Sequence, residues 1–278
     1  MSSLPAPLPS QYSAYVPCFN NETTIGKTLL SLQHQSLAPS ELLLVDDCST
    51  DGSTSVAIQL GIQVISNGAN RGRGFVRAYA MQAAHHDLVV SCDATNHLPN
   101  DFVENALPWF SDPNVAAVFG RIWQQKSVTI ADRWRARHLF KMDEQMEINP
   151  NAQLITYGCI LRRSAVLHVG NFDPSLIHSE DAELGLRLSR AGYSVVFDPR
   201  LHVIPVCSNS ISEVLERYWR WYAGKDEDSS IFSYIRQIIY SFKVLVVKDI
   251  VKRDFMSVVI SILCPHYQFW RSWSRRKR

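Results

Sequence analysis

The sequence predicts an α/β fold: a mixed, mostly parallel sheet flanked by helices, followed by a C-terminal helical extension. Three observations support this prediction. Short apolar runs alternate with stretches of helical spacing for about 200 residues, which is typical of a parallel-cored sheet. The 278 residues are 46% hydrophobic, enough to bury a sizeable core. Beyond residue 230, apolar residues recur at helical spacing and basic residues lie mostly off that stripe.

The elements follow in order along the chain. The apolar runs expected to form buried strands are residues 42–45, 62–65, 88–90 and 115–118. Helical spacing occurs at residues 23–37 and 72–84, and Thr23 or Thr24 is a suitable N-cap for the first helix. Because parallel strands end at the same edge of a sheet, a ligand is expected outside their carboxyl ends.

We expect three segments: a disordered N-terminal segment at residues 1–10, an α/β domain at residues 11–225, and a basic amphipathic helical tail at residues 226–278. The six cysteines are scattered, with no CxxC pair, and the first ten residues do not resemble a signal peptide. These features favour reduced thiols in the cytoplasm over a secreted disulfide scaffold or a zinc ribbon.

Acidic and glycine-rich segments follow the expected strands. Asp46 and Asp47 end a buried strand, and two adjacent carboxylates are more than a turn requires. They could accept hydrogen bonds from a nucleobase or a ribose. Residues 70–74 (Asn-Arg-Gly-Arg-Gly) lead into a helix, where glycines beside the N-terminus can cradle phosphate. Asp93 follows the next strand and is expected in the same cleft.

Five segments are informative because of the order in which they occur along the chain. They are residues 16–22, 46–53 (Asp-Asp-Cys-Ser-Thr-Asp-Gly-Ser), 70–77, 170–193 and 217–221 (Arg-Tyr-Trp-Arg-Trp). Together they resemble the motifs of inverting glycosyltransferases of family 2, which have the GT-A (Rossmann-like) fold. The second segment resembles the family's nucleotide-binding motif DDxSxDGS. The last resembles its QxxRW motif, with Arg217 in place of Gln. The resemblance spans about residues 11–225, the predicted GT-A domain.

This resemblance implies a role for each matching residue. Asp181 would be the catalytic base, since one positioned carboxylate suffices to deprotonate an acceptor hydroxyl. The donor and its nucleotide would be bound by Pro17, Asn20, Glu22, Asp46, Asp47, Arg77, Asp93 and Arg220. The acceptor side would be formed by Glu180, Trp221 and Gly158. The region 120–160 would shape it, through Arg121, Trp123, Trp134, Tyr157 and Gly158.

The resemblance also implies a divalent cation, Mg²⁺ or Mn²⁺, held by the donor diphosphate and by Asp93. The acid expected two residues after Asp93 is Thr95, and Pro205 stands where the family often has a metal-binding histidine. Both ions prefer carboxylate oxygens, so we expect weaker divalent-ion binding than usual, with Asp93 as the protein ligand.

The implied activity is non-processive, inverting transfer of one sugar from a UDP-, GDP- or dTDP-linked donor to an acceptor hydroxyl. The acceptor would be a glycan or a lipid-linked glycan, in the synthesis of cell-surface polysaccharide, glycolipid or glycoconjugate. One alternative is a catalytically inactive relative that binds a nucleotide sugar or a partner, an interpretation motivated by Thr95 and Pro205. A sugar-1-phosphate nucleotidyltransferase is disfavoured, because its Gly-rich opening loop has no counterpart in residues 11–22.

The charge is distributed unevenly. Residues 231–278 carry ten Lys/Arg and two Asp/Glu, a net charge of +8, whereas residues 1–230 carry 18 and 24. The apolar runs of this tail are shorter than the roughly 20 residues needed to span a bilayer. The second run is expected to stop at Pro265. Nucleic acid is disfavoured as a partner, because the basic residues interleave with aliphatic runs.

Two interpretations of the tail stay open. In one, it packs on the domain as a C-terminal helix. In the other, it lies on the inner face of the membrane as a peripheral anchor, with Trp270, Trp273 and the basic residues 275–278 at the headgroups. Either interpretation leaves the chain in the cytoplasm.

Overall fold

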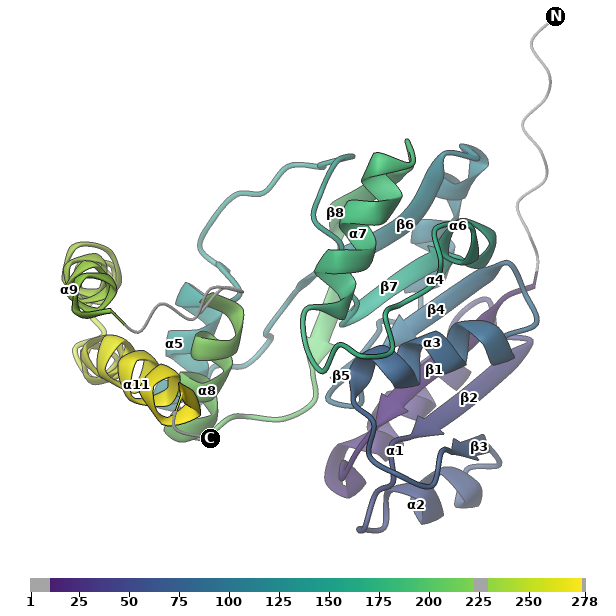
Figure 1. Cartoon of the computed structure of the whole chain (residues 1–278), viewed down its shortest axis with the longest axis horizontal. Coiled ribbons are helices and arrows are strands. Elements are labelled where there is room, and N and C mark those ends of the chain that lie inside the picture. The colour runs from purple at the N-terminus through teal and green to yellow at the C-terminus, as the bar shows by residue number, and fades with distance from the viewer. Residues whose placement is uncertain (1–10, 223–229, 277–278) are drawn as a thin grey trace, which may run out of the picture. The chain divides into compact units, whose positions relative to one another are not determined.

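The structure is a computed structural model, and it describes residues 11–222 and 230–276, with side chains as far as Ser274 (Figure 1). The expected disordered segment 1–10, the expected boundary at residue 225 and the side chains of the last four basic residues lie outside these ranges. Two compact units form, Met1–Trp123 with Gln145–Cys207 and Gln124–Glu144 with Ser208–Arg278. This division groups the segment Gln124–Glu144 with the C-terminal helices, whereas the sequence placed it in the domain 11–225.

The first unit is built on an eight-stranded sheet in the order β3-β2-β1-β4-β7-β6-β8-β5. Its strands are β1 (Ser13–Cys18), β2 (Glu41–Asp46), β3 (Gln63–Ser66), β4 (Leu88–Cys92), β5 (Asn96–His97), β6 (Val115–Ile122), β7 (Gly158–Arg162) and β8 (Ser194–Pro205). Strands β3, β2, β1 and β4 are parallel, as are β6 and β8. Strand β7 is antiparallel to β4 and β6, and β5 to β8. The predicted mixed, mostly parallel sheet is confirmed.

Helices cover both faces of this sheet (Figure 1). They are α1 (Glu22–Gln33), α2 (Ser53–Gln59), α3 (Arg73–Ala83), α4 (Phe102–Ala106), the 3₁₀ helix η1 (Leu107–Ser111), α6 (Arg163–His168) and α7 (Glu180–Arg190). One apolar cluster joins the sheet to α1, α2 and α4, and a second joins it to α3, α6 and α7. Along β2, Leu44 enters the first cluster while Leu43 and Val45 enter the second, the alternation expected of a strand buried on both faces.

The start of α1 differs from the sequence prediction. Its N-cap residue is Asn21, which makes no capping hydrogen bond through its side chain. Thr24 instead donates its hydroxyl to the Asn21 carbonyl at 3.3 Å. The prediction of a Thr23 or Thr24 cap was therefore wrong, because contacts with a neighbouring loop fix where this helix begins.

The second unit is helical. It contains α5 (Ile130–His138), α8 (Ile211–Tyr222), α9 (Ile231–Tyr240), the π-helical turn η2 (Ser241–Val246), α10 (Val247–Val251) and α11 (Val258–Arg276). Pro265 lies inside α11, so the helix continues past the end of the apolar run. Proline has no N–H and leaves the carbonyl of Ser261, four residues earlier, without its helical donor. The Ser241 hydroxyl donates to that carbonyl at 2.6 Å, which lets the helix continue.

None of the helices in the described ranges combines the length and the apolar character needed to cross a membrane.

Candidate active site

Several of the predicted donor-binding residues lie at the carboxyl ends of parallel strands. Asp46 ends β2, Asp93 follows β4, and Asn20 follows β1. From β1 the chain proceeds to β2 and β3 on one side and returns to β4 on the other, so the topological switch point lies between β1 and β4. Ligands of open α/β sheets bind outside the carboxyl ends of the strands at such a point. Pro17, half-buried, lies beyond the last β1 residue that pairs with β4.

Two loops at this edge hold each other through reciprocal hydrogen bonds. The Asn20 amide donates to Ser49 Oγ at 2.9 Å, and the Thr50 amide donates to Asn20 Oδ1 at 2.8 Å. The Gly52 amide donates to Glu22 Oε2 at 3.1 Å. The side chains of Asn20 and Glu22 therefore satisfy backbone groups of the loop after β2 and fix its path.

The adjacent carboxylates Asp46 and Asp47 are both buried and have different partners. Asp47 Oδ1 accepts from the Arg71 amide and Oδ2 from the Gly72 amide, each at 2.8 Å. Asp46 accepts from the Ser49 amide at 3.2 Å. Asp47 thus orders the segment before α3, where Gly72 has φ of 86°, a conformation that favours glycine.

Arg77 connects the two halves of the site. Its Nε donates to Glu180 Oε1 at 3.1 Å, and its Nη2 to Asp93 Oδ1 at 2.7 Å. Its Nη1 donates to Ser91 Oγ at 2.7 Å, and the Tyr15 hydroxyl lies 3.4 Å from the same nitrogen. Arg77 is 1% exposed. Burial opposes its charge, but Tyr15, Asp93 and Glu180 outweigh that effect and hold the pKa of Arg77 well above its ordinary value.

The segment before α7 is held close to the start of α3. The Gly74 amide donates to the Leu176 carbonyl at 3.0 Å, and a Cβ at Gly74 would lie 2.2 Å from the Asp173 carbonyl oxygen. Only glycine permits this approach. It brings the first residues of α7, Glu180 and Asp181, toward the end of β4.

Asp181, the predicted base, is half-buried beside Glu180. Its Oδ1 accepts from the Ala182 amide at 2.8 Å, and Thr156 Oγ1 lies 3.5 Å from its Oδ2. Burial, helped by the neighbouring Glu180 carboxylate, raises the pKa of Asp181 above its ordinary value, although Arg77 opposes the shift. A carboxyl with a raised pKa in a cleft is a candidate for proton transfer.

The structure brings together Asp93, Glu180 and Asp181 around Arg77. Glu180 is 2% exposed and paired with Arg77, so its carboxylate faces inward and not toward an acceptor. Gly158 packs inside the sheet, since a Cβ there would lie 2.6 Å from a Val203 methyl group. Both residues, which were predicted for the acceptor side, are therefore buried by their contacts within the first unit.

The predicted residues Trp134, Arg220 and Trp221 belong to the second unit. Trp134 is fully buried there and donates its Nε1 to Ser261 Oγ at 2.8 Å, so its side chain is part of the packing of that unit. Arg220 and Trp221 lie in the last turn of α8. Trp221 is 45% exposed.

Two residues of the site were missed from the sequence, Tyr15 and Ser91. They pair directly across β1 and β4, and both are fully buried. The sequence did carry a signal for Ser91, which is the polar residue inside the apolar run Leu88–Cys92. A buried hydroxyl needs a hydrogen-bond partner, so a polar neighbour could have been expected there.

The residues present fit a divalent cation that is held mainly by the phosphates of a bound substrate and by few protein ligands. Among the residues that the structure describes, no group of three or more His, Cys, Asp or Glu converges to hold a metal. The Asp93 side chain is 30% exposed and gives one oxygen to Arg77, while Thr95 offers a neutral hydroxyl. Mg²⁺ is commonly held by one or two carboxylates with substrate phosphates and water, a pattern that Asp93 can serve.

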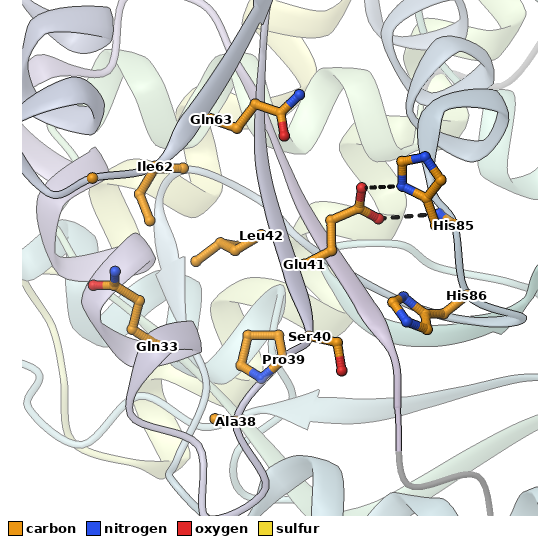
Figure 2. Close-up of a pocket in the computed structure, with 11 residues that line it drawn as sticks. Gln33, Ala38, Pro39, Ser40, Glu41, Leu42, Ile62, Gln63, His85 and His86 are labelled. Atoms are coloured by element: carbon orange, nitrogen blue, oxygen red, sulfur yellow. Dashed lines mark hydrogen bonds and ion pairs between the residues drawn. The ribbon is translucent and has the colours of Figure 1, made fainter.

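A cavity of about 690 Å³ lies at the opposite edge of the sheet and does not belong to this site (Figure 2). It is lined by residues at the amino ends of strands, among them Glu41, the first residue of β2, and Gln63, the first of β3. Glu41 accepts from the His85 amide at 3.1 Å and lies 2.6 Å from His85 Nδ1.

Solved structures show the class of fold. The chain aligns with a mannosyltransferase from Pyrobaculum calidifontis in complex with GDP-Man and Mn²⁺, at a TM-score of 0.58 and 15% identity, over 95% of this chain and 73% of that one. It also aligns with residues 1–349 of TarS from Staphylococcus aureus in complex with UDP-GlcNAc, at a TM-score of 0.54 and 17% identity, over 75% and 64%. The chain has a GT-A-like fold.

Sequence comparison shows the family. Residues 13–170 match the profile described as "Glycosyl transferase family 2", and the chain belongs to this family. It is 28% identical over 213 residues to succinoglycan biosynthesis protein ExoA of Rhizobium meliloti, covering 69% of this chain and 64% of that protein. It is 21% identical over 265 residues to poly-β-1,6-N-acetyl-D-glucosamine synthase of Staphylococcus aureus, covering 88% and 62%. The chain thus spans under two thirds of the length of these relatives.

Proposed function

We propose that this chain transfers one sugar from a nucleotide-diphosphate donor to an acceptor hydroxyl, with inversion and without processivity. The observation that carries this proposal is the Arg77-centred cluster at the topological switch point, which joins Asp93 to Glu180, the neighbour of Asp181. Membership of glycosyltransferase family 2 supports the reaction class.

In this proposal Asp181 removes the proton from the acceptor hydroxyl as that oxygen attacks the anomeric carbon from the face opposite the leaving diphosphate. A raised pKa makes Asp181 a stronger base than an ordinary carboxylate, and a positioned base contributes about 10²–10⁴-fold. Arg77 is a positioning residue, because its guanidinium is buried and pairs with both Asp93 and Glu180.

The nucleoside would bind at the loops ordered by Asp46 and Asp47, and the diphosphate would lie near Asp93. A bound Mg²⁺ or Mn²⁺ would neutralise charge on the departing diphosphate, with Asp93 as its protein ligand. Arg220 and Trp221 are proposed to act on the donor and acceptor sides, as the family resemblance implies.

The donor is proposed to be linked to UDP, GDP or dTDP. Among the structural neighbours, one binds GDP-Man and another UDP-GlcNAc, so both nucleotides occur on this fold. The acceptor is proposed to be a glycan or a lipid-linked glycan of the cell surface, since curated relatives synthesise succinoglycan and poly-β-1,6-N-acetyl-D-glucosamine.

The second candidate is a nucleotide-sugar-binding module without transferase activity. Thr95, at the position of a metal-binding acid, is the observation that favours it. Catalytic turnover of a donor by the purified protein would exclude this candidate.

The experiment compares Asp181→Asn with Asp101→Asn, a matched change at the exposed N-cap of α4. A thermal-shift screen of nucleotide sugars first identifies the donor, because a bound ligand stabilises the folded state. Asp181→Asn should then lower the transfer rate by about 10²–10⁴-fold while donor affinity stays close to that of the unmodified chain. Full activity in Asp181→Asn would contradict the assignment of the base.

A further inference from the structure

The C-terminal helices of the second unit bury several polar side chains and expose many large apolar ones. Beside buried apolar residues such as Leu245, Ile260 and Cys264, many of their buried positions are polar, including Ser233, Ser241, Asp249, Ser257 and Ser261. Many exposed positions on these helices and on the turn between α10 and α11 are large and apolar. They include Phe232 at 75%, Val251 at 72% and Trp270 at 54% on the helices, and Phe255 at 67% and Met256 at 60% on the turn. Helices surrounded by water show the opposite pattern, and contiguous exposed apolar surface marks an interaction site.

The buried polar groups are satisfied inside the unit. Ser261 Oγ donates to Asp249 Oδ2 at 2.6 Å, and the Ser241 hydroxyl donates to the Ser261 carbonyl. On its other oxygen, Asp249 meets Arg137 and His138 of α5. Helices α9 and α11 also pack together, with Tyr234 Oη 2.7 Å from His266 Nδ1 (Figure 1). Small residues and interhelical hydrogen bonds at the contact are typical of helices whose outer face meets an apolar phase.

The charges on these helices are also sorted. Both acids of residues 231–274 are turned toward α5, where Asp249 pairs with Arg137 and Asp254 pairs with Arg133. Exposed cations lie among the apolar side chains instead: Arg236, Lys243 and Arg253. Within the described residues none of these three forms an ion pair with an acid. The outer face therefore combines apolar side chains with cations that have no acidic partner in the part of the chain that the structure describes.

We propose that this face of α9, η2, α10 and α11 binds the surface of an anionic lipid bilayer. Aromatic and aliphatic side chains would enter the boundary between headgroups and acyl chains, and the cations would contact the headgroups. Charge complementarity decides against a second copy of the chain as the occupant, because an isologous pair would bring the same cations face to face. The proposal is independent of the reaction proposed above.

The test uses the full chain with vesicles of phosphatidylcholine alone and with added phosphatidylglycerol. The unmodified chain should sediment with the anionic vesicles and be released as salt is raised. Phe242→Ser with Phe255→Ser should lower partitioning about tenfold or more, through lost insertion. Lys243→Glu with Arg253→Glu should lower it by at least about 25-fold, since each cation contributes about fivefold.

Matched controls carry the same kinds of change on the first unit. Ile58→Ser replaces a side chain that is 65% exposed on α2, and Arg190→Glu reverses an exposed cation on α7. Both controls should partition like the unmodified chain. Brominated lipid should quench tryptophan fluorescence, and Trp270→Phe should reduce that quenching.

Three results would overturn the proposal. The chain could fail to bind anionic vesicles at low salt, or the two test variants could partition like their controls. Alternatively, light scattering could show a dimer that the Phe242→Ser, Phe255→Ser variant converts to monomer, in which case a second copy covers this face.

Discussion

Replacing Arg77 with methionine should destabilise the first unit by about 3–5 kcal/mol, because the change leaves the Glu180 carboxylate buried without its countercharge. The Glu180 side chain is 3% exposed, so water cannot take the place of Arg77. The Ser91 hydroxyl loses a 2.7 Å hydrogen bond as well. Domains are usually stable by 5–15 kcal/mol, so the variant should fold with a much reduced margin.

The assay is urea unfolding, combined with hydrogen exchange of the β1 and β4 amides, which reports on the first unit alone. Adding Glu180→Gln to Arg77→Met should restore about half of the lost stability, since a neutral amide costs less to bury. Adding Asp93→Asn should restore less, because the Asp93 side chain is 30% exposed and is hydrated when unpaired. This reasoning would be refuted if Arg77→Met lowered the free energy of unfolding by less than about 1 kcal/mol. It would also be refuted if Glu180→Gln and Asp93→Asn restored the same amount of stability.

Three further predictions concern the same site. Glu180→Gln should move the acid limb of kcat/KM to lower pH, because it removes a negative neighbour that raises the pKa of Asp181; a pH–rate profile that does not move would contradict this. Gly74→Ala should lower the free energy of unfolding by about 1–3 kcal/mol, because a methyl group there would overlap two backbone carbonyls. Gly26 is a helical glycine with room for a methyl group, so Gly26→Ala should raise the free energy of unfolding by about 0.5–1 kcal/mol. Urea unfolding measures both changes. Thr95→Asp should tighten Mn²⁺ binding in the presence of a nucleoside diphosphate, measured by titration, and unchanged affinity would place the cation elsewhere.

Local pattern was sufficient to predict much of the fold. Alternating apolar runs predicted β2, β3, β4 and β6, and short-range turn chemistry placed Asp46 and Asp93 at one edge of the sheet. The contacts that define the site could not be predicted this way, because they join distant positions. Arg77 and Glu180 are 103 residues apart in sequence, and nothing near either of them indicates the other.

The second unit shows the same limit in another form. The apolar run of the tail ends at Pro265, and proline usually ends or kinks a helix. Its place inside α11 depends on a hydroxyl from Ser241, twenty residues upstream of the carbonyl that it satisfies. Likewise, Arg137 meets Asp249 across 112 residues, so the tail could not be assigned to α5 from local periodicity.

Arg77 forms a direct ion pair with only one of the two adjacent acids at the start of α7, Glu180 and not Asp181. This difference separates the roles of the two acids. The N-terminus of a helix favours ionised carboxylates, which would make both acids weak bases. Burial has the larger effect on Asp181, whose pKa is raised. Its folded state therefore holds a proton more tightly than the unfolded chain does, and its contribution to the free energy of unfolding falls as pH rises above the ordinary carboxyl pKa. Glu180 gives its Oε1 to Arg77 at 3.1 Å, whereas the hydrogen bonds to Asp181 come from a backbone amide and a long contact with Thr156. A base must exchange its proton during each reaction, so we infer that the acid without a direct ion pair carries the chemistry and the paired acid holds it in place.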